Sequence, residues 1–170
     1  RDRSVSRGLG DVYKRQAVNF EQKHVIPRKV VERFGEDLTG KTFAIWGLAF
    51  KPDTDDMRQA AAITIINELT KRGAKVKAYD PKAEKEARVC YLKDNKNVEY
   101  CDSKYTVLVD ADAMILVTEW KEFRQPDFIE IKKRLKNPVI FDGRNQFDAH
   151  SLSDKGFEYY QIGVSSKLNK

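Results

Sequence analysis

The sequence contains little cysteine and no long apolar run. Only Cys90 and Cys101 occur among 170 residues, which excludes a disulfide framework and indicates two reduced thiols in a cytoplasmic protein. No apolar stretch approaches the ~20 residues that a transmembrane helix needs. No charged segment followed by an apolar one suggests a secretion leader. We therefore expect no membrane partner.

Histidine is equally scarce. His24 and His150 lie far apart, with no Cys or Asp partner at the spacing of a metal site. Neither cysteine lies near the start of an expected helix with a basic neighbour that would activate its thiol. The residues therefore indicate no metal site, no nucleophile and no catalytic acid–base pair in this chain.

The net charge of +6 is unevenly distributed. Residues 1–16 hold five Arg or Lys and two Asp, so they carry +3 of this charge. This segment is rich in Ser, Gly and Arg, has no helical or strand periodicity, and resembles an adapter-derived leader. We interpret it as foreign to the fold; the alternative is a disordered basic arm that binds anions. Because the remaining chain has no concentrated basic face, we expect no nucleic-acid partner.

The residues from 17 onward predict an α/β protein. Apolar residues in 17–38 have mostly helical spacing and indicate the end of a longer helix, which Pro27 would kink or restart. Residues 39–164 alternate between strand and helix patterns, and residues 165–170 form a tail that we expect to be mobile. Expected strands are 42–48, 75–80, 97–101, 112–118, 138–143 and 157–163. Expected helices are 56–72, 81–92, 103–111, 127–135 and a short one ending at 151–156.

Six strands with intervening helices predict a Rossmann-like, doubly wound, mainly parallel sheet with flanking helices, preceded by a long helix. Ligands of such sheets bind at the carboxyl ends of the strands. Those ends carry the segments GLAFKPDTDD, YDP, TEW and DGRNQF. These four segments are therefore the candidate site.

The first segment departs from a glycine-rich phosphate turn. After Gly47 it has Ala49, Phe50 and Lys51 where further glycines are typical. Lys51 can bind a phosphate as a point charge. Three acids follow, at positions 53, 55 and 56. We expect Asp55 or Asp56 to cap the next helix, and the three negative charges to repel a phosphate held at its start. Phe50 could stack on a base or pack against the sheet, and its spacing favours packing.

Two further charged residues have open roles. Arg58, one turn inside the expected helix, could form a salt bridge with Asp53 or Asp55, or contact a second anion. Asp80 ends the second strand, where dinucleotide sites place an acid on a ribose. Without the glycine pattern, a turn formed by Asp80 and Pro81 is the favoured interpretation.

Arg144 follows the fifth strand directly. Its planar guanidinium suits a bidentate contact with phosphate or carboxylate, although a solvated surface position is equally compatible with the pattern. Asp142 is close enough in sequence to hold it in place. Thr118, Glu119 and Trp120 end a buried strand on the same rim, and we expect Trp120 to pack rather than to bind ligand.

The motifs GLAFKPDTDDMR, AYDPKA, LVTEWKEFR and FDGRNQFD, in this order, resemble the carboxyl-terminal, UDP-binding domain of the UDP-glucose 6-dehydrogenase family. The resemblance covers residues 17–166. The first motif is shared with nucleotide-sugar dehydrogenases that act on GDP-mannose or UDP-N-acetylhexosamines, whereas TEW and DGRNQF look more like the UDP-glucose branch.

The resemblance implies an enzyme with two Rossmann-like domains joined by a long helix that mediates homodimerisation, of which residues 17–38 look like the end. Its amino-terminal domain binds NAD and carries the catalytic cysteine, and two NAD oxidise UDP-glucose to UDP-glucuronate. Carried over by motif, Phe50, Lys51 and Arg144 contact the substrate, and Arg58 reaches the NAD.

The dinucleotide fingerprint and the cysteine motif of that family do not occur in this sequence. The resemblance therefore implies a fragment that is inactive alone and carries no catalytic residue. Two alternatives remain open: a dehydrogenase for another nucleotide sugar, either GDP-mannose or a UDP-N-acetylhexosamine, and a non-catalytic module that binds a nucleotide sugar.

Overall fold

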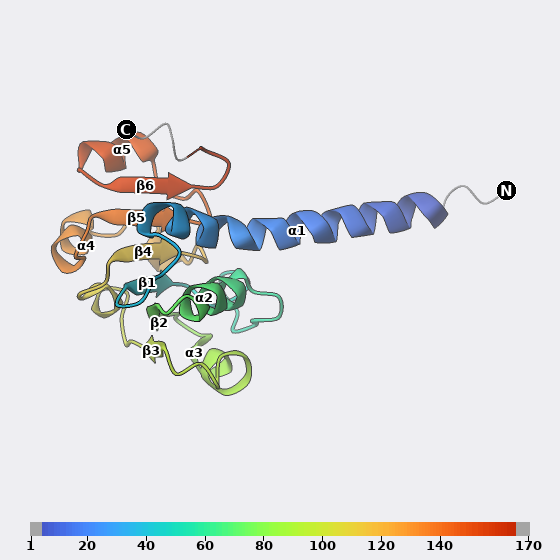
Figure 1. The fold of residues 1–170 in the computed structure, drawn as a ribbon, viewed down its shortest axis with the longest axis horizontal. Coiled ribbons are helices and arrows are strands. Elements are labelled where there is room, and N and C mark those ends of the chain that lie inside the picture. Colours follow the sequence, from blue (N-terminus) through green and yellow to red (C-terminus); the bar gives the residue numbers. More distant parts are fainter. Residues whose placement is uncertain (1–4, 166–170) are drawn as a thin grey trace.

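The computed structural model describes residues 5–165, and their centre is a six-stranded sheet (Figure 1). The strands are β1 (Thr42–Trp46), β2 (Lys75–Tyr79), β3 (Val98–Tyr100), β4 (Ala113–Leu116), β5 (Val139–Asp142) and β6 (Glu158–Gln161). Their order is β3-β2-β1-β4-β5-β6, and every neighbouring pair is parallel. The prediction of a doubly wound parallel sheet is confirmed.

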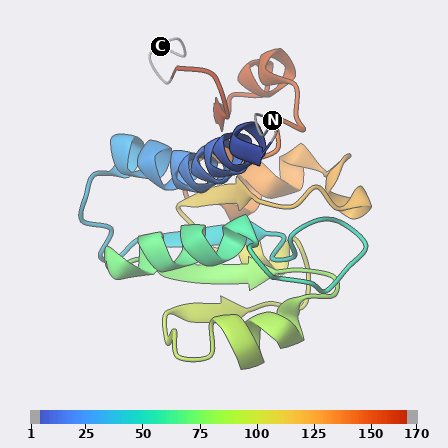
Figure 2. The ribbon, with the colours of Figure 1, turned by 90° about the vertical axis from the view of Figure 1, so that its right-hand side faces the viewer.

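Helices connect the strands. They are α1 (Val5–Phe34), α2 (Ala61–Lys71), α3 (Glu84–Glu86), α4 (Phe128–Arg134) and α5 (Ala149–Asp154). A π-helical turn spans Ala87–Tyr91, and 3-10 turns span Thr106–Leu108 and Lys121–Phe123. The carboxyl half of α1 lies beside α2 on one face of the sheet (Figure 2).

The core lies on the three central strands. All four residues of β4 and of β5 are buried, and so are four of the five in β1. Strands covered by helices on both faces have such continuous apolar runs, which is why their pattern is clear in the sequence. At the end of β1, the Trp46 ring stacks on Phe123 with centroids 4.9 Å apart.

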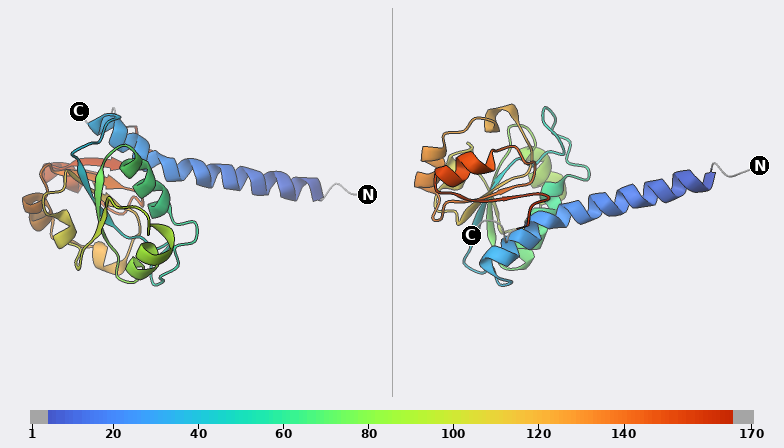
Figure 3. Two further views of the ribbon diagram at one scale, coloured as in Figure 1. Left: turned by 60° about the horizontal axis from the view of Figure 1, so that its bottom comes forward. Right: turned by 90° about the horizontal axis from the view of Figure 1, so that it is seen from above.

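Helix α1 projects far beyond the sheet (Figure 3). It begins at Val5 rather than at residue 17, and Pro27 lies within it without ending it. Residues 5–16 are therefore helical although their sequence has no helical periodicity. The alternative of a disordered arm is wrong for these residues. Residues 10–22 are exposed. The foreign origin of 1–16 stays a prediction, and most of the expected mobile tail lies outside the described residues.

Two predicted helices differ from the structure. The helix expected at 56–72 begins only at Ala61, and its N-cap residue, Ala60, has no capping side chain. The capping role expected for Asp55 or Asp56 is wrong, because the Asp56 carboxylate folds back onto Arg58 instead. The helix expected at 103–111 is reduced to one 3-10 turn, as its β-branched residues would favour. Within residues 5–165, no helix combines the length and apolarity required to cross a bilayer.

Candidate functional site

The carboxyl ends of β1, β4, β5 and β6 surround a cavity of about 540 Å³ together with α1. The loop after β1 and the start of α2 form one wall, and the loops after β4, β5 and β6 form another. The lining residues are Asn19, Gln22, Lys23, Phe50, Gln59, Ala61, Val117, Glu119, Gly143, Arg144, Asn145 and Ile162. The cavity therefore lies at the edge of the sheet where doubly wound folds bind ligands.

Phe50 and Arg144 meet at this cavity although they are far apart in sequence. Phe50 is 52% exposed, so the expectation that it packs against the sheet is wrong. Its backbone N–H donates to the Asp56 carbonyl at 2.8 Å, which closes the loop 50–56. The next residue, Lys51, is exposed and is not among the residues that line the cavity. The aromatic ring is thus available to a ligand base or sugar.

Arg144 forms a bidentate pair across the cavity wall with Glu119. Its Nη2 donates to Oε1 at 2.8 Å, and its Nε donates to Oε2. Burial raises the pKa of Glu119, but hydrogen bonding and the positive charge of Arg144 outweigh it, and the pKa is lower than usual. Lys23 of α1 adds a second cation to the lining. The cavity therefore presents two positive groups and one negative group.

Asp142 holds the backbone of the loop that carries Arg144. Its side chain is fully buried. It accepts hydrogen bonds from the backbone N–H of Arg144 at 2.8 Å, Gln146 at 2.8 Å and Phe147 at 3.0 Å, and from the Tyr159 hydroxyl at 2.8 Å. Burial and then the Asp142 charge raise the pKa of that tyrosine well above its usual value. Asp142 therefore positions Arg144 through its backbone, whereas Glu119 holds its guanidinium.

Asp80 holds the loop after β1. It is buried, with 5% of its surface exposed. Its carboxylate accepts from five N–H groups: the backbone of Leu48 at 2.7 Å, Ala49 at 3.0 Å, Lys82 at 2.8 Å and Ala83 at 2.8 Å, and Nε1 of Trp120 at 3.0 Å. The expected turn at Asp80 is present, and so is the expected packing of Trp120. The Thr118 hydroxyl completes the anchor by donating to the Ala49 carbonyl at 2.6 Å.

Arg58 lies outside the cavity lining and before α2, not within a helix. Its Nη2 donates to Asp56 Oδ2 at 2.8 Å, so neither Asp53 nor Asp55 is the partner expected from the sequence. Hydrogen bonding from Arg58 lowers the pKa of Asp56 to about 2. The arginine side chain is 81% exposed. Its guanidinium therefore faces solvent beside the loop that carries Lys51.

The contribution of α1 to the cavity is absent from the prediction made on the sequence. Asn19, Gln22 and Lys23 line the cavity and are spaced three and four residues apart. This spacing places polar side chains on one helical face, and that face is the available signal. The prediction omits it because it interprets residues 17–38 only as an interface between subunits. It places Glu119 on the rim, but it does not anticipate the pairing with Arg144.

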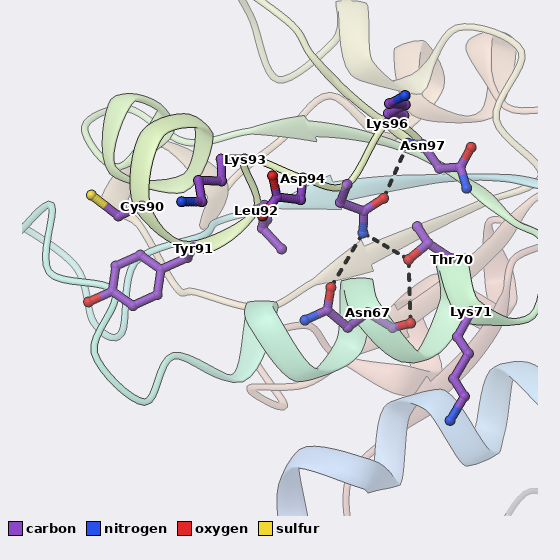
Figure 4. A pocket seen from close by; sticks show the side chains of 11 residues that line it. Asn67, Thr70, Lys71, Cys90, Tyr91, Leu92, Lys93, Asp94, Lys96 and Asn97 are labelled. Carbon is purple, nitrogen blue, oxygen red and sulfur yellow. Dashed lines mark hydrogen bonds between the residues drawn. The ribbon is translucent and has the colours of Figure 1, made fainter.

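A second cavity, of about 550 Å³, lies between α2 and the segment after the π-helical turn (Figure 4). Asn95 donates from Nδ2 to Asn67 Oδ1 and to Thr70 Oγ1 across it. These polar groups thus satisfy one another, and the Lys71 side chain points away from them in Figure 4. The cavity lies away from the strand ends that carry Phe50 and Arg144, so it is not the candidate site.

Comparisons with known proteins agree with this geometry. Residues 44–149 match the family model of the UDP-glucose/GDP-mannose dehydrogenase family, UDP binding domain. The chain is 39% identical over 150 residues to UDP-glucose 6-dehydrogenase of Pseudomonas aeruginosa, covering 87% of this chain and 33% of that protein. It is 39% identical over 145 residues to UDP-glucose 6-dehydrogenase TuaD of Bacillus subtilis, covering 85% of this chain and 31% of that protein.

Solved structures show the same relationship. A UDP-glucose dehydrogenase from Pyrobaculum islandicum superposes with a TM-score of 0.72 at 27% identity, over 88% of this chain and 31% of the other. An NDP-N-acetyl-D-galactosaminuronic acid dehydrogenase from Methanosarcina mazei superposes with a TM-score of 0.72 at 29% identity, over 91% of this chain and 32% of the other. The chain spans about a third of the length of the curated relatives it matches. The chain belongs to the UDP-glucose/GDP-mannose dehydrogenase family and contains its UDP-binding domain.

Proposed function

We propose that this chain is the UDP-binding, carboxyl-terminal part of a cytoplasmic, NAD-dependent UDP-glucose 6-dehydrogenase. The observation that carries the proposal is the cavity of about 540 Å³ that Phe50 and Arg144 line together. An exposed aromatic ring offers a surface for a nucleobase or sugar, and a guanidinium offers a bidentate contact for a diphosphate. Lys51, next to Phe50, is exposed and lies outside the cavity lining, and in this proposal its flexible side chain adds a positive charge for the diphosphate.

The same proposal assigns the remaining parts of the enzyme elsewhere. NAD and the reacting cysteine belong to the other domain, and Arg58 reaches that NAD from this chain. Its 81% exposed side chain supports this role, because it is available to a group outside the domain. The chain alone then binds the nucleotide of UDP-glucose and oxidises nothing.

Helix α1 supports homodimerisation of the intact enzyme. It projects from the sheet, and it exposes Val18 by 57% and Phe20 by 62% (Figure 3). Large apolar side chains on a protruding helix are a surface that association would bury. In this proposal the partner is a second copy of the same enzyme.

The function is tested by measuring the melting temperature of the 170-residue chain with and without millimolar UDP. We expect UDP to raise the wild-type melting temperature, since a ligand that binds only the folded state stabilises it. Lys51→Ala and Arg144→Ala each remove a charged contact, and we expect each to weaken UDP binding by roughly 10–100-fold. We expect UDP to raise the melting temperature more than GDP does. The alternative, a dehydrogenase for GDP-mannose, predicts the reverse.

Two sets of controls make the test specific. Arg88→Ala removes an exposed arginine that is also paired with a glutamate, Glu84, at 2.6 Å but lies away from the cavity, so UDP should stabilise it as it stabilises wild type. Glu119→Gln combined with Arg144→Ala removes the carboxylate that Arg144→Ala leaves unpaired, and the loss of binding should persist. A wild-type chain whose melting temperature ignores millimolar UDP contradicts the proposal.

A further inference from the structure

The turn after β1 has a phosphate-binding shape but already contains an anion. Gly47 has a φ of 93°, and the two residues after it direct their backbone N–H groups at one oxygen, Asp80 Oδ2. In Rossmann units, the amides of this turn and of the helix that follows hold the phosphate of a nucleotide. Here the anion at that position is a side chain at the end of the neighbouring strand β2.

The surroundings of Asp80 match those of a bound anion. All five of its donors are uncharged N–H groups, from the backbone of four residues and the ring of Trp120. Several N–H groups converging on one oxyanion form the kind of concavity that binds phosphate in other proteins. The carboxylate is also buried, which leaves no room for an external phosphate to reach the same donors.

We propose that Asp80 is a built-in anion that occupies the phosphate position of the turn after β1 and thereby positions Phe50 and Lys51 for the UDP ligand. The second half of this inference rests on the proposed function. Leu48 and Ala49, which Asp80 fixes, directly precede Phe50. The ligand's phosphates are consequently excluded from the turn and bind to side chains at the cavity instead.

The first test is chemical rescue without UDP. Asp80→Ala keeps Cβ but empties the volume of the carboxylate, and formate has the size and charge to refill it. We expect the variant to melt about 5–10 °C below wild type in chloride, and formate at equal ionic strength to restore much of that loss. Formate should not raise the wild-type melting temperature beyond the value in chloride. If formate shifts the melting temperatures of the variant and of wild type equally, the proposal that Asp80 is a built-in anion is refuted.

The second test measures positioning. In chloride, Asp80→Ala should lose most of the UDP-induced rise in melting temperature, and formate should return part of it. Asp112→Ala is the matched control, because Asp112 is also buried and accepts a backbone N–H, from Thr42 at 2.8 Å, at the opposite edge of the sheet. It should lose stability yet keep the UDP-induced rise. An Asp80→Ala variant that keeps the full rise in chloride overturns the positioning role.

Asp80→Asn covers the case in which the alanine variant does not fold in chloride. It keeps the volume of the side chain and one acceptor oxygen, and it should fold with a reduced UDP-induced rise. Folding of Asp80→Ala only in formate would itself support the anion. Because the rescue arm contains no UDP, a wild-type chain that ignores UDP would refute the proposed function while leaving the built-in anion to be decided by formate alone.

Discussion

Replacing Asp142 by asparagine tests whether the loop carrying Arg144 depends on a buried negative charge. The substitution keeps the shape of the side chain but turns one oxygen into an NH₂ donor. Three donors converge on Oδ2, namely Gln146 N, Phe147 N and the Tyr159 hydroxyl, whereas Oδ1 accepts from Arg144 N. The amide oxygen will therefore face the three donors, and the new NH₂ will face the backbone N–H of Arg144.

The magnitude follows from these four contacts. Hydrogen bonds to a charged group contribute about 1.5–3 kcal/mol, and neutral ones about 0.5–1.5 kcal/mol. Three bonds are weakened and the part-buried N–H of Arg144 loses its acceptor, so we expect the free energy of unfolding to fall by about 3 kcal/mol. Tyr159→Phe removes only one of the four donors and should cost about 1 kcal/mol.

Urea unfolding followed by tryptophan fluorescence measures both losses, because Trp46 and Trp120 are buried. The slope of the free energy with urea should stay constant, since the fold is retained. Glu99→Gln is the control: it makes the same chemical change on an exposed residue and should stay within about 0.5 kcal/mol of wild type. An Asp142→Asn variant equally close to wild type refutes the anchoring role.

Two further changes test the turn and the attachment of α1. Gly47→Ala places a Cβ 2.5 Å from Thr118 Cβ at a φ of 93° and should cost at least about 3 kcal/mol in urea unfolding, whereas Gly163→Ala, at a φ of 82° in open space, should cost only about 1 kcal/mol. Hydrogen bonding from Arg33 lowers the pKa of Glu158 below 4.5. A carboxyl group whose pKa is lower in the folded state stabilises the fold at pH values above its unfolded pKa. Arg33→Ala should therefore lower the free energy of unfolding at neutral pH, by roughly 0.5 kcal/mol because the pair is half-exposed. This loss should disappear as the pH falls through the folded pKa of Glu158. Urea unfolding of wild type and of Arg33→Ala from neutral to acidic pH measures this loss. A difference in the free energy of unfolding that stays constant with pH contradicts the assignment.

The strands are predictable from the sequence because burial on both faces leaves a direct trace in it. The runs at 42–48 and 112–118 contain β1 and β4, whose residues are almost all buried. Helix starts are less predictable, because a capping residue is identified by what its side chain contacts. Asp56 has the right residue type for a cap, but α2 begins only at Ala61 with Ala60 as its N-cap, and the Asp56 carboxylate pairs with Arg58 instead.

The site is predictable only where strand order determines it. Residues that follow parallel strands reach one edge of the sheet, so the strand pattern alone is enough to place Phe50 and Arg144 together. It is not enough to pair Arg144 with Glu119, because that contact joins loops 25 residues apart whose side chains must also point toward each other. The polar face of α1 is a visible pattern whose position over the strand ends depends on the tertiary fold.

Buried Asp80 explains why the turn after β1 can lack the usual glycines, and buried Asp142 has the same role in the loop after β5. A loop that binds phosphate with backbone N–H groups needs glycines so that the ligand can approach the chain. A loop that presents side chains to a ligand must instead keep its backbone fixed, and its N–H groups need other acceptors because buried donors are costly when unpaired. Asp80 and Asp142 supply those acceptors to the loops that carry Phe50 and Arg144. In the proposed function, side-chain recognition and backbone anchoring by a carboxylate are two parts of one arrangement. A substitution that restores the glycines without removing Asp80 should therefore create no phosphate site.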